Sequence, residues 1–326
     1  MPRDRLRWGL LSTARINRRL IPAIRAAERA DLVAVASRDR ARVEDYAADW
    51  GIPRALGSYE ALLADPEVDA LYISLPNKYH VEWTVRAAQA GKHVLCEKPL
   101  ALSVDECDQV IAAARSAGVV VMEAAMYLYH PLLHKARQLV RDGAVGDVTL
   151  VRGAFSFPLD RPADVRWDPR LGGGSLWDVG SYPVSFIRWI AGEPKEVFGW
   201  QTPSPSGVDA TFAGLLRYDG GVLGAFDSSF RGEYRIQAEV AGTEGVLILE
   251  RPYAMVPESR LILQRGLEQE EIALLPSDAY QCEVEALTAA ALDGAELPVP
   301  LASSRANVAT LVALYESARR GEPVQL

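Results

Sequence analysis

Two short segments of the chain carry residue types that can take part in acid–base chemistry. Glu97-Lys98-Pro99 follows the apolar run His93–Cys96, which is typical of a buried strand. Asp178 and Tyr182 lie four residues apart, so a helix would place the carboxylate and the phenol on one face. Pro183 indicates the first turn of that helix, because a proline inside a helix costs about 3 kcal/mol. Lysine, aspartate and tyrosine side chains can each hold or move a proton.

Polar residues also follow another predicted strand, at Leu75-Pro76-Asn77 with His80 three residues later. In open α/β sheets, ligands bind beyond the carboxyl ends of the strands. These residues and Glu97-Lys98 should therefore face the same crevice as Ser12 to Ile16, which follow the first predicted strand.

The first 125 residues alternate short apolar runs with segments of helical period, which indicates repeated βαβ units and a parallel sheet. Asp39 and Ser103 suit helix N-caps, while Gly91 and Gly118 suit C-caps. The predicted strands are Leu6–Leu11, Leu32–Ala36, Ala70–Ser74, His93–Cys96 and Val119–Met122. The predicted helices are Ile16–Ala27, Asp39–Trp50, Tyr59–Leu63, Val81–Ala90 and Val104–Ala117. We expect a doubly wound nucleotide-binding domain over residues 1–125.

After about Met126 the pattern changes to a helix at Leu128–Asp142, a long polar loop, a further helix and a series of strands. Asp219-Gly220-Gly221 predicts a hairpin between two of these strands. The predicted strands are Val197–Gln201, Thr211–Tyr218, Val222–Phe230, Tyr234–Ala241, Gly245–Leu249 and Leu261–Gln264, and the closing helices are Tyr280–Leu292 and Ser303–Arg319. We expect residues 126–326 to form a second α/β domain with an open, mainly antiparallel sheet arranged as a meander.

The turn after the first strand carries small residues where dinucleotide-binding proteins carry glycines. In the G-x-G-x-x-G fingerprint, backbone N–H groups at a helix N-terminus approach a pyrophosphate. Ser12, Ala14 and Asn17 occupy the three glycine positions here. The turn is therefore either a nucleotide site built from small residues or an ordinary βα turn.

The end of the second strand favours NADP over NAD. An NAD-selective site would carry an acidic residue there to hold the ribose 2′-hydroxyl. Ser37 and Arg38 instead offer donors to a 2′-phosphate, and Arg42 lies one helical turn later. The alternative is that Arg38 is a solvated loop residue.

Composition excludes several other classes of protein. The chain has 326 residues, enough for two domains, and 35 basic against 43 acidic residues give a net charge of −8, which disfavours nucleic acid as a partner. The three cysteines do not form a zinc motif, which suits a reducing cytoplasm and predicts no metal site. The longest apolar stretch is broken by Glu123 and His130, so we expect no membrane span.

The order and spacing of these motifs resemble the Gfo/Idh/MocA family of oxidoreductases over nearly the whole chain. The matching segments are the turn after the first strand, Pro76-Asn77 with His80, Glu97-Lys98-Pro99, Glu123-Ala124, Met126-Tyr127, Tyr129-His130-Pro131, Gly172 to Tyr182, and Arg188 with Gly192. The resemblance implies a Rossmann domain followed by an α/β domain, whose open sheet would join a homodimer or homotetramer. Within the family, Ser12-Thr13-Ala14 and Ser37-Arg38 are most similar to the NADP-dependent branch of pentose and dihydrodiol dehydrogenases and of anhydrofructose and ketosugar reductases.

The resemblance also implies roles for individual residues. Lys98, as the lysine of the Glu-Lys-Pro motif, would exchange a proton with the substrate oxygen or stabilise an alkoxide during hydride transfer. Many family members have histidine where this chain has Tyr182, and a phenol is a weak base at neutral pH unless a cation assists it. We therefore hypothesise that Lys98 assists Tyr182, while Asp178 orients a substrate hydroxyl.

The expected cofactor contacts are Ser12, Thr13, Ala14, Arg15, Ile16, Ser37, Arg38, Arg42, Leu75, Pro76, Asn77, His80, Glu97, Lys98, Arg166, Trp167 and Tyr280. The expected substrate contacts are Lys98, Tyr127, Tyr129, Phe155, Phe157, Arg166, Trp167, Asp178 and Tyr182. Their aromatic faces and few donors suit a sugar, a sugar derivative or a small cyclic diol.

Three functions remain open at this point. The first is an NADP-dependent dehydrogenase or reductase acting on CH–OH groups, with NAD as the possible alternative cofactor. The second is a redox-assisted glycoside hydrolase that holds NAD tightly and regenerates it in each cycle. The third is a non-catalytic sensor that binds a nucleotide and a partner protein.

Overall fold

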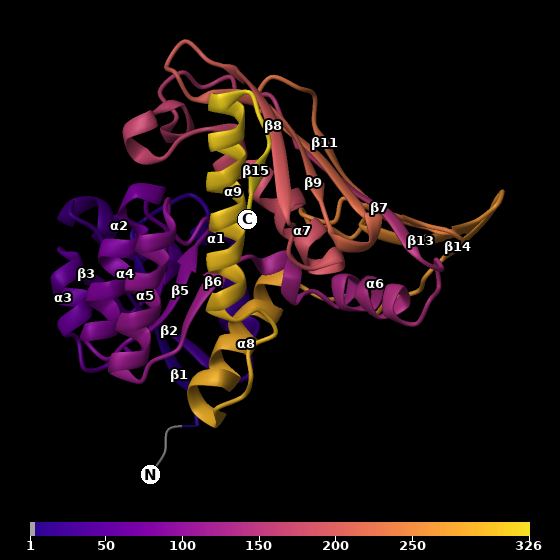
Figure 1. Cartoon of the computed structure of the whole chain (residues 1–326). Coiled ribbons are helices and arrows are strands. Elements are labelled where there is room, and N and C mark those ends of the chain that lie inside the picture. The colour runs from indigo at the N-terminus through magenta and orange to yellow at the C-terminus, as the bar shows by residue number, and fades with distance from the viewer. Residues whose placement is uncertain (1–3) are drawn as a thin grey trace. The chain divides into compact units, whose positions relative to one another are not determined.

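The computed structural model describes residues 4–326, which divide into two compact units (Figure 1). The first unit comprises residues up to Tyr129 together with Asp278–Arg305, and the second comprises His130–Ser277 together with Ala306–Leu326. The predicted boundary at residue 125 lies near Tyr129, after which the chain first passes from the first unit to the second. The prediction did not foresee that residues 278–305 return to the first unit.

The first unit is built on a parallel sheet. In the described residues its six strands have the order β3-β2-β1-β4-β5-β6, and every neighbouring pair is parallel. The strands are β1 (Leu6–Leu11), β2 (Ala30–Ala36), β3 (Arg54–Leu56), β4 (Ala70–Ile73), β5 (His93–Glu97) and β6 (Val121–Ala124). The five predicted strands are all present, and β3 is the strand that the prediction missed. A strand of three residues is too short to show a clear hydrophobic period.

Helices α1 (Asn17–Ala26), α2 (Arg40–Trp50), α3 (Tyr59–Ala64), α4 (His80–Gln89) and α5 (Val104–Ala117) connect these strands. Two N-caps are confirmed, because Asp39 accepts from the Arg42 amide at 3.1 Å and Ser103 accepts from the Glu106 amide at 3.3 Å. Gly118 ends α5 with a φ of 65°, which glycine adopts at little cost.

Helix α8 (Ala279–Asp293) belongs to the first unit although it lies near the end of the chain. It packs against α1 and against the short helix η2 (Met126–Tyr129). Val284 and Leu287 on α8 are fully buried, so the helix covers apolar surface of the first unit.

The second unit is built on a large mixed sheet. Within the part of the chain that the structure describes, its nine strands have the order β14-β13-β12-β11-β7-β10-β9-β8-β15. The strands are β7 (Val148–Ser156), β8 (Glu196–Pro203), β9 (Asp209–Arg217), β10 (Leu223–Ser229), β11 (Arg235–Gly242), β12 (Val246–Glu250), β13 (Arg260–Arg265), β14 (Glu268–Glu271) and β15 (Val324–Gln325). The predicted hairpin at Asp219-Gly220-Gly221 joins β9 and β10, which pair antiparallel.

The prediction of a simple meander is wrong at one place. Strand β7 lies between β10 and β11, and it runs parallel to β10 and antiparallel to β11. Its segment was predicted to be loop, because Gly153 interrupts the apolar pattern in the middle of the strand. An added Cβ at Gly153 would lie 2.5 Å from the Tyr253 hydroxyl and 2.7 Å from Pro183. Glycine at this position therefore allows Tyr253 and Pro183 to pack closely against the strand.

Helices α6 (Pro131–Arg141) and α7 (Ser181–Ala191) belong to the second unit, together with α9 (Leu301–Arg320) from residue 306 onward. Helix α7 packs on β7 and β10. The predicted helix Leu128–Asp142 is interrupted at His130, which caps α6 by accepting from the Leu132 amide at 3.1 Å. Among the helices of residues 4–326, none is both long enough and apolar enough to cross a membrane.

Candidate active site

Hydrogen bonds between small side chains hold the turn after β1. Ser12 is 7% exposed, and its Oγ lies 2.9 Å from the Oγ of Ser74 at the end of β4. Asn17 is fully buried, donates to the Ser12 carbonyl at 2.8 Å and accepts from Ser74 at 2.8 Å. Ser12 has a φ of 136°, a conformation that glycine adopts more readily. The three side chains thus stabilise a glycine-like turn without glycine.

This turn lies where a doubly wound sheet binds ligands. The strand order reverses between β1 and β4, and the Ser12–Ser74 contact joins the ends of these two strands. Helix α1 begins there without a side-chain cap and without an acidic residue in its described first turn. The positive end of the helix dipole, the small Ala14 and the exposed Arg15 therefore fit a pyrophosphate.

Two guanidinium groups lie near the end of β2. Burial raises the pKa of Tyr59, the nearby guanidinium groups of Arg38 and Arg42 offset part of that effect, and Arg42 Nη2 lies 3.5 Å from the carbonyl oxygen of Thr13. Both arginines are exposed, and neither forms an ion pair with another described residue. Arg40 between them differs, because it pairs with Glu44 at 2.9 Å. Two uncompensated positive charges at this strand end fit a cofactor that carries an additional phosphate.

Ser37 has a local role in the same loop. It is 8% exposed, and its Oγ accepts from the Asp39 amide at 3.2 Å. Its hydroxyl hydrogen remains available as a donor, because this bond uses an oxygen lone pair.

His80 joins the two polar loops that follow β4 and β5. It is fully buried, with Nε2 at 2.7 Å from the Leu75 carbonyl and Nδ1 at 2.7 Å from the Pro99 carbonyl. Burial lowers the pKa of His80, while the two carbonyl contacts act in the opposite direction. The structure therefore assigns this ring to positioning the Leu75-Pro76-Asn77 loop and the Lys98–Pro99 turn. Direct contact of His80 with the cofactor stays a prediction.

Glu97 and Lys98 lie at the end of β5, and both are partly exposed. The Tyr72 hydroxyl on β4 donates to Glu97 Oε1, and the Lys98 amide lies 3.3 Å from Glu97 Oε2. Glu97 is thus held by its neighbour on β4 and in turn contacts the backbone of the lysine. The Lys98–Pro99 peptide bond is cis.

A second glutamate lies buried near this strand end. Glu283 of α8 is 1% exposed, and its Oε1 has no hydrogen-bond partner in the described chain. Burial raises the pKa of Glu283, and the charges of Glu97 and Glu123 raise it further. Glu123 is also buried and accepts from the Leu100 amide at 2.8 Å. Sequence reasoning missed Glu283, because the buried side of α8 is not visible in its sequence pattern.

The second unit presents Asp178 and Tyr182 on one short segment. Asp178 lies in a π-helix, η5 (Leu176–Gly180), and Tyr182 lies in the first turn of α7, as Pro183 predicted. Between Gly174 and Val184, Asp178 and Tyr182 are the two residues that are partly exposed, while their neighbours are buried. The segment therefore offers one carboxylate and one phenol to a ligand.

Arg166 neutralises the carboxylate of Asp178. Its Nε donates to Asp178 Oδ2 at 2.5 Å, and its Nη1 contacts Asp164 at 3.2 Å. The charge of Asp178, followed by that of Asp164, raises the pKa of Arg166. Arg166 was predicted to contact the cofactor, and the structure places it against Asp178 within the second unit.

Aromatic rings surround Tyr182 and the Arg166 loop. Phe155 on β7 lies 5.4 Å from the ring of Tyr182 and 6.0 Å from that of Tyr253, measured between centroids. Trp167 lies 5.2 Å from Phe230 and packs on a small apolar cluster that also includes Val179. Phe155 and Trp167 are both partly exposed, which keeps them as candidates for substrate contact.

Phe157 is partly buried and packs on the same cluster of the second unit, and the other predicted aromatic contacts lie in the first unit. Tyr127 and Tyr129 in η2 are 1% and 5% exposed, and burial raises the pKa of Tyr129. Packing therefore explains these two rings better than substrate contact does. Tyr280, in the first turn of α8, is partly exposed, and its predicted contact with the cofactor stays a prediction.

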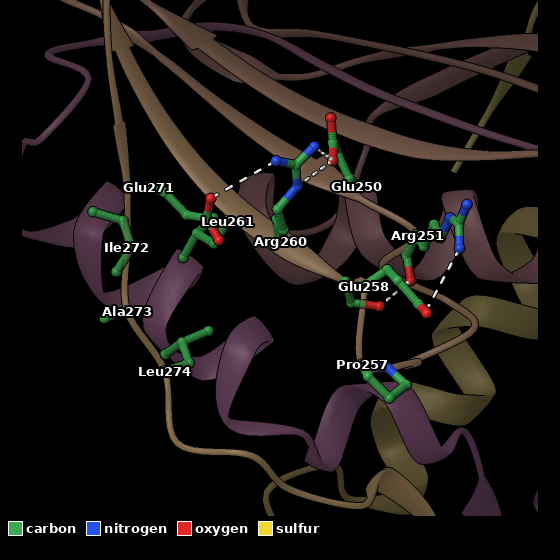
Figure 2. Close-up of a pocket in the computed structure, with 11 residues that line it drawn as sticks. Glu250, Arg251, Pro257, Glu258, Arg260, Leu261, Glu271, Ile272, Ala273 and Leu274 are labelled. Atoms are coloured by element: carbon green, nitrogen blue, oxygen red, sulfur yellow. Dashed lines mark hydrogen bonds and ion pairs between the residues drawn. The ribbon is translucent and has the colours of Figure 1, made fainter.

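A separate hollow of about 620 Å³ lies beside β12 and β13, and predicted catalytic residues do not line it (Figure 2). Its two arginines are compensated, since Arg251 contacts Glu258 at 3.6 Å and Arg260 contacts Glu250 at 2.6 Å. Because both arginines are paired with glutamates, the charges of this hollow do not favour binding of an anion. Groups of three or more histidine, cysteine, aspartate or glutamate residues that could hold a metal ion do not occur among the described residues.

Comparison with known proteins decides the family. Residues 6–125 match the model for the Gfo/Idh/MocA oxidoreductase family, NAD-binding Rossmann fold, and residues 133–248 match the model for the Gfo/Idh/MocA C-terminal domain. The chain belongs to the Gfo/Idh/MocA family. It is therefore an oxidoreductase with a nucleotide-binding Rossmann domain.

Curated proteins match the chain over most of its length. D-xylose 1-dehydrogenase (NADP(+)) 2 of Haloferax volcanii is 41% identical and covers 98% of this chain and 99% of its own length. Trans-1,2-dihydrobenzene-1,2-diol dehydrogenase of Mus musculus is 35% identical, with 76% of each chain covered.

Solved structures share the fold of this chain. An aldose-aldose oxidoreductase from Caulobacter crescentus, complexed with glycerol, has a TM-score of 0.92 at 28% identity and covers 99% of this chain and 100% of its own. The 3-ketoreductase KijD10 from Actinomadura kijaniata, in complex with NADP and TDP-benzene, has a TM-score of 0.90 at 27% identity, covering 96% and 98%.

Proposed function

We propose that this Gfo/Idh/MocA protein is an NADP-dependent dehydrogenase or reductase whose substrate is an uncharged sugar or a cyclic diol. The observation that carries the proposal is that Asp178 and Tyr182 are the two partly exposed polar groups of an otherwise buried segment. Relatives that are named as xylose and dihydrodiol dehydrogenases support this substrate class.

The preference for NADP rests on the end of β2. Arg38 and Arg42 are exposed guanidinium groups without an acidic partner among the described residues. A 2′-phosphate would give these two cations a negatively charged partner, whereas a ribose hydroxyl is uncharged. The NADP-dependent xylose dehydrogenase relative and the NADP complex of KijD10 agree with this preference.

Bound NADP(H) would accept or supply the hydride at a carbon that carries a hydroxyl or carbonyl oxygen. A side chain of the protein must then transfer a proton to or from that oxygen. We assign this task to Lys98 and Tyr182, with the ammonium stabilising negative charge and the phenol transferring the proton. Asp178, fixed by Arg166, would accept a hydrogen bond from a neighbouring substrate hydroxyl.

The charges near Asp178 favour an uncharged substrate. The arginines of segment 160–171 are all paired, because Arg161 contacts Asp164 at 3.0 Å, Arg166 contacts Asp178, and Arg170 contacts Asp168 at 2.7 Å. The segment therefore has no spare cation for a phosphate or carboxylate, whereas its rings and carboxylate suit the faces and hydroxyls of a polyol.

The proposal is tested with purified protein and a panel of pentoses, hexoses, anhydrosugars and cyclic diols, assayed in both directions by nicotinamide absorbance. Each compound is paired with NADP(H) and NAD(H), and sugar phosphates and uronic acids are included as charged counterparts. We expect turnover of at least one uncharged compound with NADP(H). Inactivity on the whole panel together with undetectable cofactor binding would refute the proposal.

The same assay, with simple glycosides added to the panel, separates the two alternatives. A redox-assisted glycoside hydrolase would retain NAD through purification and would cleave glycosides without net change in cofactor absorbance. A sensor would bind cofactor without turnover, and the presence of Lys98, Asp178 and Tyr182 argues against it, since a binding protein does not require proton-transfer groups.

We also propose that the outer face of the second sheet joins two copies of the chain. Trp200, Leu215 and Leu223 on three consecutive strands are 63%, 51% and 48% exposed, and cross-strand register places them on the same face. Apolar side chains gathered in this way are typical of a protein interface. Light scattering should give a dimer or tetramer, and Leu215→Glu should shift it toward monomer. A monomeric wild-type protein would refute this point.

The three cysteines support a reducing compartment, and we propose the cytoplasm. All three are free, with Cys96 and Cys107 buried and Cys282 partly exposed.

A further inference from the structure

A buried carboxylate lies beneath the start of the π-helix that carries Asp178. Asp209, the first residue of β9, is 2% exposed. Its Oδ2 accepts from the Ser175 hydroxyl at 2.7 Å and from the Leu176 amide at 2.8 Å, and its Oδ1 accepts from the Tyr315 hydroxyl at 2.6 Å. Three donors from two distant segments thus converge on one side chain.

Two of these donors belong to the first residues of the π-helix region. The Leu176 amide opens η5, and Ser175 precedes it directly. Ser175 also lies 3.0 Å from the Ser228 hydroxyl of β10, so its side chain is held on two sides. Asp209 therefore accepts a hydrogen bond from the first amide of the helix, as an N-cap side chain does, although it lies on a strand that is distant in the sequence.

The glycine before this cap makes the contact possible. Gly174 has a φ of 124°, and an added Cβ would lie 2.2 Å from Asp209 Oδ1 and 2.8 Å from the Tyr315 hydroxyl. Its carbonyl accepts from the Asp178 amide at 3.1 Å. The backbone that fixes Asp178 thus rests directly on the Asp209–Tyr315 pair.

We propose that Asp209 is a positioning residue, which fixes the start of the π-helix so that Asp178 and Tyr182 point together toward the substrate. The inference rests on the proposed function, because it assigns Asp209 a role through Asp178 and Tyr182. A sideways shift of about 1 Å in such groups can lower a rate by about a hundredfold.

The energetics of Asp209 agree with a functional role. Burial raises its pKa, and the bonds from Tyr315, Ser175 and Leu176 offset part of that effect. Arginine and lysine do not form an ion pair with it among the described residues. A buried carboxyl without a cation lowers stability at neutral pH compared with a neutral group of the same shape. This cost in stability is consistent with a role of the Asp209 hydrogen bonds in positioning Asp178 and Tyr182.

The test compares Asp209→Ala, Asp209→Asn, Ser175→Ala and Tyr315→Phe in the full-length protein. An asparagine can keep its oxygen on Ser175 and Leu176, so it serves as the conservative variant, whereas alanine removes every bond. Tyr218→Phe is the matched control for Tyr315→Phe, because Tyr218 is also a buried phenol of the second unit and its hydroxyl has no partner in the described chain.

We expect kcat to fall about a hundredfold in Asp209→Ala, with KM changed much less and NADPH affinity unchanged. Asp209→Asn should recover most of kcat and should be at least as stable as the wild type. Ser175→Ala and Tyr315→Phe should lower kcat to an intermediate degree, and Tyr218→Phe should not. Equal kcat in all variants, or a loss that merely follows melting temperature, would overturn the proposal.

Amide hydrogen exchange gives a second readout that needs no substrate. Peptides covering residues 174–182 should exchange faster in Asp209→Ala and Tyr315→Phe than in the wild type and in Tyr218→Phe. If wild-type protein lacks activity on the whole substrate panel, the proposed function fails, while this exchange result still decides whether Asp209 fixes the π-helix. Unchanged exchange would refute the positioning role.

Discussion

Arg166 and Asp178 form a hydrogen-bonded ion pair within the second unit, with Nε of the arginine 2.5 Å from Oδ2 of the aspartate. The two residues are twelve positions apart, and a loop with two short helices, η3 (Val165–Trp167) and η4 (Pro169–Leu171), brings them together. The arginine was expected to serve the cofactor. In the structure it contacts the carboxylate that we assign to the substrate, and its contact with the cofactor stays a prediction.

Arg166→Gln should weaken the orientation of Asp178. We expect kcat/KM to fall by about tenfold or more, because a charge-assisted hydrogen bond contributes about 1.5–3 kcal/mol. Steady-state kinetics on the best substrate measures this. The matched control is Arg170→Gln, which breaks the exposed pair with Asp168 in the same loop and should leave kcat/KM near wild type. Equal losses in both variants would mean that loop stability, and not Asp178, is what Arg166 provides.

Tyr182→Phe and Lys98→Met should each lower kcat by about 10²- to 10⁴-fold, the usual contribution of a proton-transfer group. Binding of NADPH, followed by fluorescence titration, should be retained in Tyr182→Phe, because this change removes one hydroxyl from the second unit. The double variant should lose little more than the worse single variant if the two groups serve one step. Wild-type turnover in either single variant would remove that residue from the mechanism.

Arg38→Ala should change the preference for the cofactor. We expect KM for NADPH to rise about 10- to 100-fold, with little change for NADH, because the substitution removes one charge-assisted contact to the 2′-phosphate. Arg40→Ala is the control, since Arg40 is also exposed in the same segment but is paired with Glu44. A parallel rise for NADPH and NADH in Arg38→Ala would contradict the assignment.

Glu283→Gln should stabilise the protein increasingly as pH rises. Burial and the charges of Glu97 and Glu123 raise the pKa of Glu283 in the folded state above the ordinary value of a glutamate. The native state therefore binds the proton more tightly than the unfolded state does, and the wild type loses stability as pH rises above about 4.5. Glutamine removes this loss.

Urea midpoints of wild type and Glu283→Gln, measured from acidic to alkaline pH, test this prediction. The difference between them should grow with pH in favour of the variant. Glu285→Gln, an exposed change on the same helix, should show no such trend. A constant difference would mean that Glu283 is ionised in the folded protein without cost.

Local patterns predicted the first unit well, because its strands and helices each show their own period and caps. Helix α5 has the predicted ends, and Asp39 and Ser103 cap as expected. The second unit was harder, since the place of β7 depends on pairing with β10, which lies some seventy residues later. Pairing over such a distance leaves no local pattern in the sequence.

In the candidate site, too, residues in local motifs were predicted from the sequence, whereas contacts between distant residues were not. The segment Gly172 to Tyr182 was found because its residues are adjacent in sequence, and the prolines at 76 and 99 marked two strand ends. Asp209 was missed, since its partners Ser175 and Tyr315 are 34 and 106 positions away. His80 was also singled out, but the two backbone carbonyls that contact its ring cannot be read from side-chain types, and its contact with the cofactor stays a prediction.

The return of α8 to the first unit makes that unit discontinuous in sequence. The chain passes between the two units after Tyr129, after Ser277 and after Arg305. A fragment ending at residue 125 would lack the helix that covers α1 and would expose the apolar surface under Val284 and Leu287. The cofactor-binding unit cannot be cut out or exchanged between relatives at a single junction. A chimaera that keeps it intact must carry α8 with it.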